Sequence, residues 1–170
     1  CRRFKYDINN YLATLGSEAP VKDLDEIIAS GRTHPTIRPR LEYFQQVEDP
    51  PDQDESCLRS LPNRERLRTA VRSQLETQQL DAMVYPTWSN PPRLIGDLNT
   101  PHGDNSQDLA PGTGFPAITV PMGYVRGSLP VGLQIFGDAW SEPRLIALAY
   151  SYEQATMHRR APATTPRLGH

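Results

Sequence analysis

Hydrophobic side chains recur every three or four positions in several stretches of the chain, the spacing that gathers them on one face of an α-helix. Residues that begin or end helices bound these stretches. Asp23 and Glu26 form a capping box, Pro39 suits a first helical turn, and Asn63 and Ser141 are good N-caps. Helices are therefore predicted over residues 2–15, 23–31, from about 39, 63–79 and 141–157.

Three shorter apolar runs have the length of β-strands, at residues 82–85, 117–122 and 131–136. The connection 123–130 holds two glycines and a proline, which favours an antiparallel pair of the last two strands. The first run is apolar on both faces and follows a helix, a pattern typical of a sheet covered by helices. The order of elements predicts an α/β fold in which the helix 141–157 packs on the strand pair.

Two long connections interrupt this pattern. Residues 48–57 form an acidic, proline-containing stretch that predicts an exposed loop. Residues 86–116 form a much longer loop, and connections of that length are usually functional or disordered. The long loop carries polar and aromatic candidates for a site, namely Trp88, Asn90, His102, Asp104 and Asn105.

A Gly/Pro-rich turn ends the long loop, with Pro111, Gly112, Gly114 and Pro116 close together. Proline fixes φ and glycine permits positive φ, so such a turn suits close approach of the backbone to a ligand. The same residues also serve as ordinary punctuation between elements. Both interpretations of the turn remain open from the residues alone.

Composition limits the class of protein. The chain has 170 residues, 37% of them hydrophobic, and a net charge of −2, which describes one globular domain. No apolar run reaches the roughly 20 residues that span a bilayer, and no basic stripe indicates nucleic-acid binding. The pairs Arg2–Arg3 and Arg159–Arg160 are interpreted as solvated surface. We therefore expect neither a membrane nor a nucleic-acid partner.

The cysteines and the first residue add little. Cys1 and Cys57 can form at most one bridge and lack the C-x-x-C spacing of a zinc site, which leaves the compartment open. A sequence that begins with Cys1 and enters a helix at once is expected to be processed or to be a piece of a longer polypeptide.

The residues show no catalytic or metal-binding motif. The four histidines have no ligand spacing, and no G-x-S-x-G or phosphate-binding loop occurs, so no metal, cofactor or catalytic residue is predicted. The only lysines are Lys5 and Lys22. Lys5 is interpreted as a surface cation beside Asp7, and His102 with Asp104 as solvated turn residues.

Four blocks of the sequence resemble the C-terminal part of amidase signature enzymes. These blocks are FKYDINNYLA at 4–13, GFPAITVPMG at 114–123, LPVGLQ at 129–134, and EPRL with AYSYEQAT within 142–156. The resemblance covers nearly the whole chain and is weakest at 48–57. It implies that residues 1–170 are the C-terminal portion of one domain, built on a large mixed β-sheet flanked by helices.

The resemblance also implies a reaction and the part of the active site that this chain supplies. Family members hydrolyse amides with a serine activated through a second serine, on a cis peptide, by a lysine, while backbone N–H groups stabilise the oxyanion. The Gly/Ser-rich signature that holds this triad lies upstream of the matched part. The chain would then supply the far wall of a pocket for a small amide, together with the upstream half of the domain. The residues expected there are Asp104, Asn105, Thr113, Gly114 and Phe115.

Two other functions stay open at this point. The chain is alternatively a non-catalytic remnant or binding module that keeps the pocket wall. It is alternatively part of the amidase subunit of a tRNA-dependent amidotransferase, which needs a partner chain to deliver its substrate.

Overall fold

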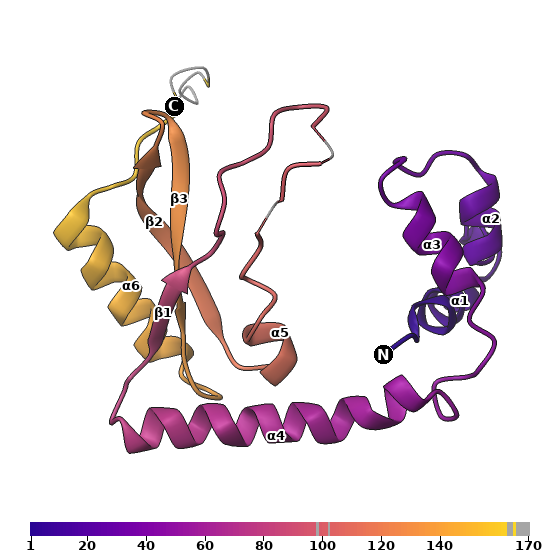
Figure 1. Ribbon diagram of the computed structural model, residues 1–170, viewed down its shortest axis with the longest axis horizontal. Helices are drawn as coiled ribbons and strands as arrows, with labels where there is room; N and C mark the ends of the chain where they lie inside the picture. The colour runs from indigo at the N-terminus through magenta and orange to yellow at the C-terminus, as the bar shows by residue number, and fades with distance from the viewer. Residues whose placement is uncertain (98, 102, 163–164, 166–170) are drawn as a thin grey trace. The chain divides into compact units, whose positions relative to one another are not determined.

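The computed structural model describes residues 1–97, 99–101, 103–162 and 165. The chain divides into two compact units, Cys1–Arg66 and Leu67–His170. The first unit is helical, and the second combines helices with a three-stranded sheet (Figure 1). Helices and a sheet in this order agree with the predicted α/β class, while the assignment of residues 1–170 to one domain stays a prediction.

Three helices and a short 3-10 turn make up most of the first unit: α1 (Phe4–Thr14), η1 (Gly16–Glu18), α2 (Leu24–Ala29) and α3 (Arg38–Gln45). The predicted capping box is confirmed at α2, where the Asp23 side chain accepts from the Glu26 N–H at 2.9 Å. The Glu26 carboxylate in turn accepts from the Lys22 N–H at 2.8 Å. Pro39 lies in the first turn of α3, as predicted.

Lys5 joins α1 to the end of α3. Its Nζ donates to the carbonyl oxygens of Gln45 at 3.0 Å and Val47 at 3.1 Å. A cation at the C-terminal end of a helix satisfies carbonyls that have no helical partner. The interpretation of Lys5 as a surface cation beside Asp7 is therefore wrong, because Asp7 pairs with Arg3 at 2.7 Å instead.

A disulfide between Cys1 and Cys57 closes the first unit. It ties the beginning of the chain to the first turn of α4 (Glu55–Thr77) across 56 positions of sequence. The two cysteines therefore form the one bridge that their number allows.

Asp54 corrects the prediction that residues 48–57 form only an exposed loop. Its side chain is 1% exposed and pairs with Arg2 at 2.5 Å, so Arg2 is not merely a solvated surface residue. Ser56 Oγ and the Cys57 N–H also donate to Asp54 Oδ1, the second over 3.1 Å. A carboxylate with this many donors can be buried, because they replace the water it loses.

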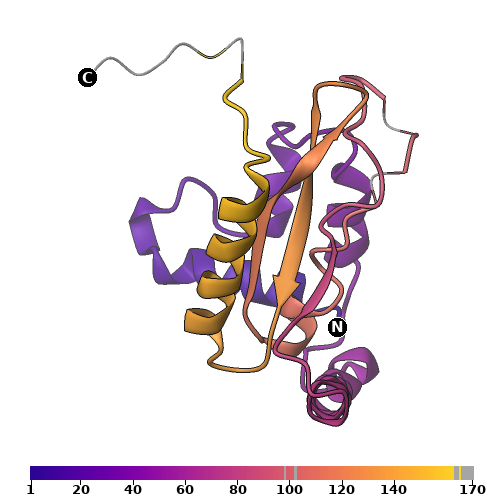
Figure 2. The ribbon, with the colours of Figure 1, turned by 90° about the vertical axis from the view of Figure 1, so that its left-hand side faces the viewer.

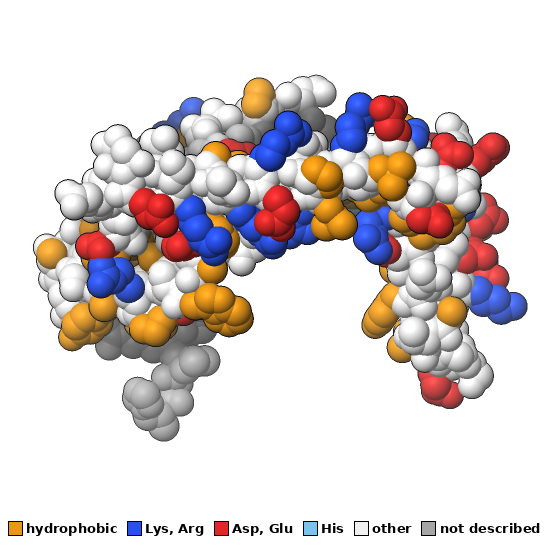
Figure 3. Space-filling view, turned by 90° about the horizontal axis from the view of Figure 1, so that it is seen from below, with side chains coloured by type: hydrophobic (Ala, Val, Ile, Leu, Met, Phe, Trp, Pro, Cys, Tyr) orange, Lys and Arg blue, Asp and Glu red, His pale blue; other side chains and the backbone are white. Residues whose placement is uncertain are grey.

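Helix α4 begins at Glu55, eight residues before the predicted N-cap Asn63. It contains Pro62, whose side chain is exposed. The predicted start is wrong because Asp54, nine residues before Asn63, caps the helix by accepting from the Cys57 N–H. The helix continues across the boundary between the units. Its outer surface carries side chains of both charges with hydrophobic ones between them (Figure 3).

The sheet of the second unit contains β1 (Met83–Pro86), β2 (Ala117–Val125) and β3 (Leu129–Phe136). Both pairings are antiparallel and the strand order is β1-β3-β2, so β3 is central. The predicted hairpin of the last two strands is confirmed. Its turn at 126–128 has positive φ at Arg126 and Gly127, which matches the twist of a tight hairpin.

Helix α6 (Glu142–Thr156) lies along one face of this sheet (Figure 2). The predicted packing of this helix on the strand pair is confirmed by a cluster that joins Leu145 and Ala149 to Val120 and Ile135. Leu148 of the same helix is 37% exposed, because Leu145 and Ala149 occupy the positions that face the sheet. Pro143 lies in the first turn of this helix, after Ser141.

The opposite face of the sheet meets α4 and the short helix α5 (Ala110–Thr113). Val71 and Leu75 of α4 form a buried cluster there with Phe115 and Phe136. The prediction that β1 is buried on both faces is wrong in this chain, since Val84 is 62% exposed. Side chains alternate between the two faces of a strand. Tyr85 packs on the α4 face, so Val84 lies on the opposite face.

Candidate functional site

The long loop turns back on itself directly after β1. The Ser89 N–H donates to the Gly103 carbonyl at 2.7 Å, and the Asn105 N–H donates to the Thr87 carbonyl at 2.9 Å. Trp88 and Asp104 form a β-bridge between these bonds. Two of the predicted site residues, Asp104 and Asn105, are thereby fixed beside the end of β1.

Asn105 connects three parts of this segment. Its Nδ2 donates to the Pro86 carbonyl at 2.9 Å, and its Oδ1 accepts from Ser89 Oγ at 2.9 Å. The side chain therefore holds the strand end and the segment that follows it in one arrangement.

Asp104 uses both carboxylate oxygens within its own loop. Oδ1 accepts from the Ser106 N–H at 2.9 Å and from Ser106 Oγ at 2.5 Å, and Oδ2 accepts from Gln107 Nε2 at 2.6 Å. These bonds are typical of a residue that fixes a turn. Its suggested neighbour His102 lies outside the described residues.

The other three predicted residues lie at the end of α5. Thr113 is fully buried, and its Oγ1 donates to the Leu109 carbonyl at 2.8 Å and accepts from the Phe115 N–H at 3.1 Å. Gly114 caps the helix in the left-handed conformation with φ of 72°, which favours glycine. The Gly/Pro turn is thus a single helical turn that redirects the chain into β2.

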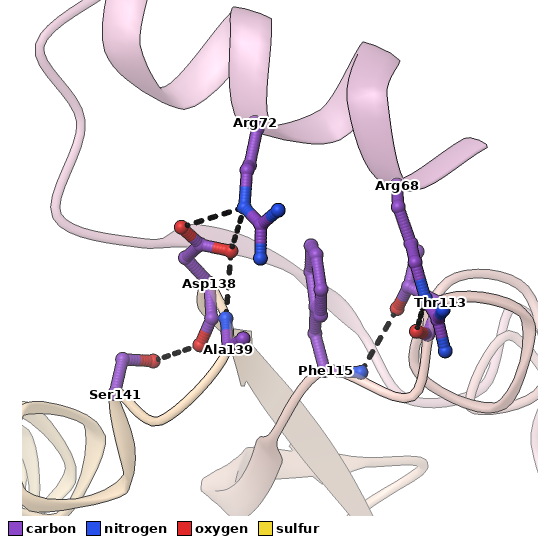
Figure 4. A network of polar contacts seen from close by, with 7 residues as sticks. All are labelled: Arg68, Arg72, Thr113, Phe115, Asp138, Ala139 and Ser141. Carbon is purple, nitrogen blue, oxygen red and sulfur yellow. Dashed lines mark hydrogen bonds and ion pairs between the residues drawn. The ribbon is translucent and has the colours of Figure 1, made fainter. Parts of the chain in front are cut away.

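Two arginines of α4 hold this turn in place (Figure 4). Arg68 Nε donates to the Thr113 carbonyl at 2.5 Å. The Arg72 guanidinium stacks 5.1 Å from the centre of the Phe115 ring and pairs with Asp138 at 3.0 Å. Asp104 and Asn105 are therefore tied to the end of β1, and residues 113–115 are tied to α4.

A cavity of about 460 Å³ opens beside the first of these groups. Residues 88–93 line one side of it, and Val125, Pro130, Val131 and Gly132 of the hairpin line the other. None of the five predicted residues lines this cavity. Asp104 and Asn105 contact the cavity wall without lining it, because Asp104 is bridged to Trp88 and Asn105 accepts from Ser89.

Sequence reasoning missed most of this wall. Trp88 and Asn90 were noted as members of the loop, whereas Pro91, Pro92 and Gly132 were not singled out. Their signal was the aromatic and proline-rich run directly after a strand end, the place where sites of sheet proteins gather. Nothing in the sequence indicated that the hairpin residues line a cavity, because their pattern is already explained by their place in two strands and a turn.

Two buried polar groups lie on the α4 face of the sheet. Tyr85 and Gln134 are directly paired across β1 and β3. Within the described part of the chain, the Tyr85 hydroxyl and Gln134 Oε1 have no hydrogen-bond partner. Burial, and then the charge of Asp108, raises the pKa of Tyr85 above its ordinary value, so this phenol stays neutral at physiological pH.

Among residues 1–97, 99–101, 103–162 and 165, no group of three His, Cys, Asp or Glu side chains is placed to hold a metal ion. Nor is any helix in these ranges both long and apolar enough to cross a bilayer.

Comparison with known proteins extends the sequence resemblance. A family model described as Amidase matches residues 4–146. A probable amidase of Arabidopsis thaliana is 31% identical over 166 residues, which cover 94% of this chain and 29% of the relative. A glutamyl-tRNA(Gln) amidotransferase subunit of Clostridium acetobutylicum is 37% identical over 98 residues, covering 54% of this chain and 20% of the relative.

Solved structures give the same result. The native peptide amidase of Stenotrophomonas maltophilia is 33% identical with a TM-score of 0.73, covering 92% of this chain and 32% of that one. An amidase family protein of Bacillus anthracis is 25% identical with a TM-score of 0.69, covering 92% of this chain and 28% of that one. The chain therefore spans about a third or less of the length of these relatives.

Proposed function

Because the chain belongs to the amidase family, we propose that it is part of an amide hydrolase that converts a carboxamide into the acid and ammonia. The observation that carries this proposal is the extent of the likeness. The plant amidase and the bacterial peptide amidase align with more than nine tenths of the chain, 94% and 92%. The family model matches residues 4–146, a range that includes the long loop.

The chemistry itself is assigned to residues outside these 170. Amide hydrolysis needs an activated nucleophile, and the resembled enzymes use serines with a lysine. Lys5 is held by two backbone carbonyls, and its bonds explain it as a structural cation. The Gly/Ser-rich signature does not occur in the sequence. The proposal therefore requires that the signature region of the relatives precede this chain in the natural protein.

We assign the chain a role in shaping the pocket. Asp104 and Asn105 fix the segment after β1, and Thr113, Gly114 and Phe115 fix the entry into β2 against α4. Rigid walls matter because holding the reacting groups in the correct geometry lowers the barrier to reaction. A substrate amide would meet surfaces that these residues position.

The test is ammonia release by the natural protein that carries these residues, measured on a panel of primary carboxamides. We expect turnover, and we expect replacement of the upstream nucleophilic serine by alanine to abolish it. An Asn105→Ala variant should raise KM, since the strand end loses the side chain that binds Pro86 and Ser89. A protein that contains the signature region and releases no ammonia from any amide of the panel would contradict the proposal.

Membership of a tRNA-dependent amidotransferase is the second candidate function, favoured by the bacterial amidotransferase relatives. Their matches cover 54–58% of this chain, less than the amidase matches. The two functions differ in their acceptor. An amidotransferase passes ammonia to an aminoacyl-tRNA and needs a partner protein, so turnover of simple amides without tRNA or partner favours the hydrolase.

A further inference from the structure

We propose that the cavity between residues 88–93 and the β2–β3 hairpin binds a neutral apolar side chain of the substrate, with an aromatic ring as its best occupant. This inference rests on the proposed function, because it names the part of an amide substrate that the cavity takes. It assigns a recognition role to Trp88, a residue outside the five predicted from the sequence.

The size and lining of the cavity carry the first step. A volume of about 460 Å³ is within the range of small-molecule pockets and exceeds the needs of a single aromatic ring. The lining is mostly apolar and includes the Trp88 indole and three prolines, Pro91, Pro92 and Pro130. Indole and proline rings offer flat surfaces, on which an aromatic ring packs well.

Gly132 keeps one wall of the cavity free of a side chain. A Cβ added there would lie 2.7 Å from Thr119 Cγ2 and 2.9 Å from Thr87 Oγ1, closer than real contacts. The two threonine hydroxyl oxygens lie 3.2 Å apart, and the Gly132 carbonyl accepts from the Thr87 N–H at 2.8 Å. The glycine is therefore required by its neighbours, and its backbone lines the cavity.

The charges around the cavity favour a neutral ligand. Arg93 is the charged residue of the lining. Its positive charge acts on Asp97, whose pKa is lowered first by the Thr100 hydroxyl and backbone and then, more weakly, by Arg93. A guanidinium with a carboxylate nearby attracts a second anion less strongly. The remaining polar lining, Ser89 and Asn90, is uncharged.

The wall is formed before a ligand arrives. Ser89 is fixed by its own N–H to Gly103 at 2.7 Å and by its Oγ to Asn105 at 2.9 Å. A Cβ at Gly103 would lie 2.6 Å from Asn90 Nδ2, so the loop segment at Gly103 packs directly against the cavity-lining residue Asn90. A fixed apolar surface loses little conformational freedom on binding, which favours recognition of a ring.

The experiment compares two probes on the natural protein, N-acetylphenylalaninamide and N-acetylglycinamide. Both carry the same primary amide and differ only in the side chain. Equilibrium dissociation constants are measured by calorimetry on the variant whose upstream nucleophilic serine is replaced by alanine, and kcat/KM is measured by ammonia release from the unaltered protein. We expect the phenyl probe to bind roughly tenfold to a hundredfold more tightly, the usual effect of placing an apolar group in a fitting pocket.

Three variants locate the effect. Trp88→Ala should reduce the preference to within about threefold, and Trp88→Phe should retain most of it because the ring is kept. Trp140→Ala is the matched control, since Trp140 is 89% exposed and outside the cavity lining. It should leave the preference unchanged. Thermal unfolding of each variant separates loss of binding from loss of structure.

Equal binding of the two probes by the protein that retains Trp88 would overturn the proposal, as would an unchanged preference in a folded Trp88→Ala variant. Equal binding is also the result expected if another segment of the protein fills the cavity. The amidase proposal fails separately: a protein that releases no ammonia from either probe, yet binds the phenyl probe through Trp88, would contradict the reaction and support the cavity.

Discussion

Among single residues, Asp54 carries the largest electrostatic consequence in the first unit. The Ser56 hydroxyl, then the Cys57 N–H and the Arg2 guanidinium, hold the pKa of its carboxyl at about 2 against the effect of burial. A carboxylate whose pKa is lower in the folded than in the unfolded state stabilises the fold above the unfolded value, near 3.8. That contribution is lost as the pH falls from there through the folded value.

We therefore expect Asp54→Asn to lower the free energy of unfolding at neutral pH. The difference from the unaltered protein should shrink between pH 3.8 and pH 2, as the native carboxyl takes up its proton. Urea unfolding at a series of pH values measures it. Asp52→Asn, in the exposed part of the same loop, is the control and should change stability little at any pH. A constant difference down to pH 2 would show that shape rather than charge makes Asp54 important.

Asp104 is expected to matter for binding rather than folding, because the hydrogen bonds described for its side chain go to Ser106 and Gln107 of its own loop. Asp104→Ala should raise KM for an amide substrate several-fold and change the free energy of unfolding by about 1 kcal/mol or less. Asp104→Asn retains an acceptor for Ser106 and should have a smaller effect on KM. Amide kinetics and thermal unfolding of both variants give the answer, and a large fall in Tm with unaltered KM would make Asp104 structural.

At the scale of elements, the sequence pattern correctly predicted those features that depend on residues close together in the chain. The hairpin, the cap of α2 and the position of α6 followed from spacing, turn residues and cap residues. The start of α4 did not, because it depends on Asp54, which is stabilised by Arg2 from the other end of the unit. The same reason explains Lys5, whose acceptors are about 40 residues away. The cavity wall at Gly132 also depends on two threonines distant in sequence.

The disulfide is the element-scale feature with the clearest effect on stability. In the chain-entropy account, closing a loop over a separation of 56 residues stabilises the fold by about 4 kcal/mol. We expect Cys57→Ser to lower the free energy of unfolding by up to that amount. The unaltered protein in excess dithiothreitol should unfold at the same urea concentration as the Cys1→Ser, Cys57→Ser double variant. Unchanged unfolding after reduction would contradict a stabilising role.

At the scale of the whole molecule, the chain exposes apolar side chains that a longer relative is expected to cover. Ile146 and Tyr150 of α6 are 60% and 64% exposed, and Val84 of β1 is 62% exposed. β1 and β2 are both edge strands of the sheet. Uncovered apolar surface and open edges favour association with other copies.

We therefore expect residues 1–170, expressed alone, to associate and to release no ammonia from amides above background. Size-exclusion chromatography with light scattering measures the first property and an ammonia assay the second. Ile146→Lys should reduce association, whereas Arg159→Lys, which preserves an exposed charge, should not. Turnover by this chain that is lost on Lys5→Ala or Lys22→Ala would mean that it contains a catalytic centre of its own.

The strand order β1-β3-β2 also sets a sequence of events during synthesis. β1 is made first of the three strands, yet its neighbour β3 is the last to be made, and β2 pairs with β3 through a tight turn. Within the described sheet, residues 83–86 pair with residues 133–136, so a growing chain cannot complete this pairing until residue 136 has left the ribosome. Pairing across such a separation is slow to form. We therefore expect the apolar segment around Val84 to stay without its β3 partner for most of the synthesis of this unit.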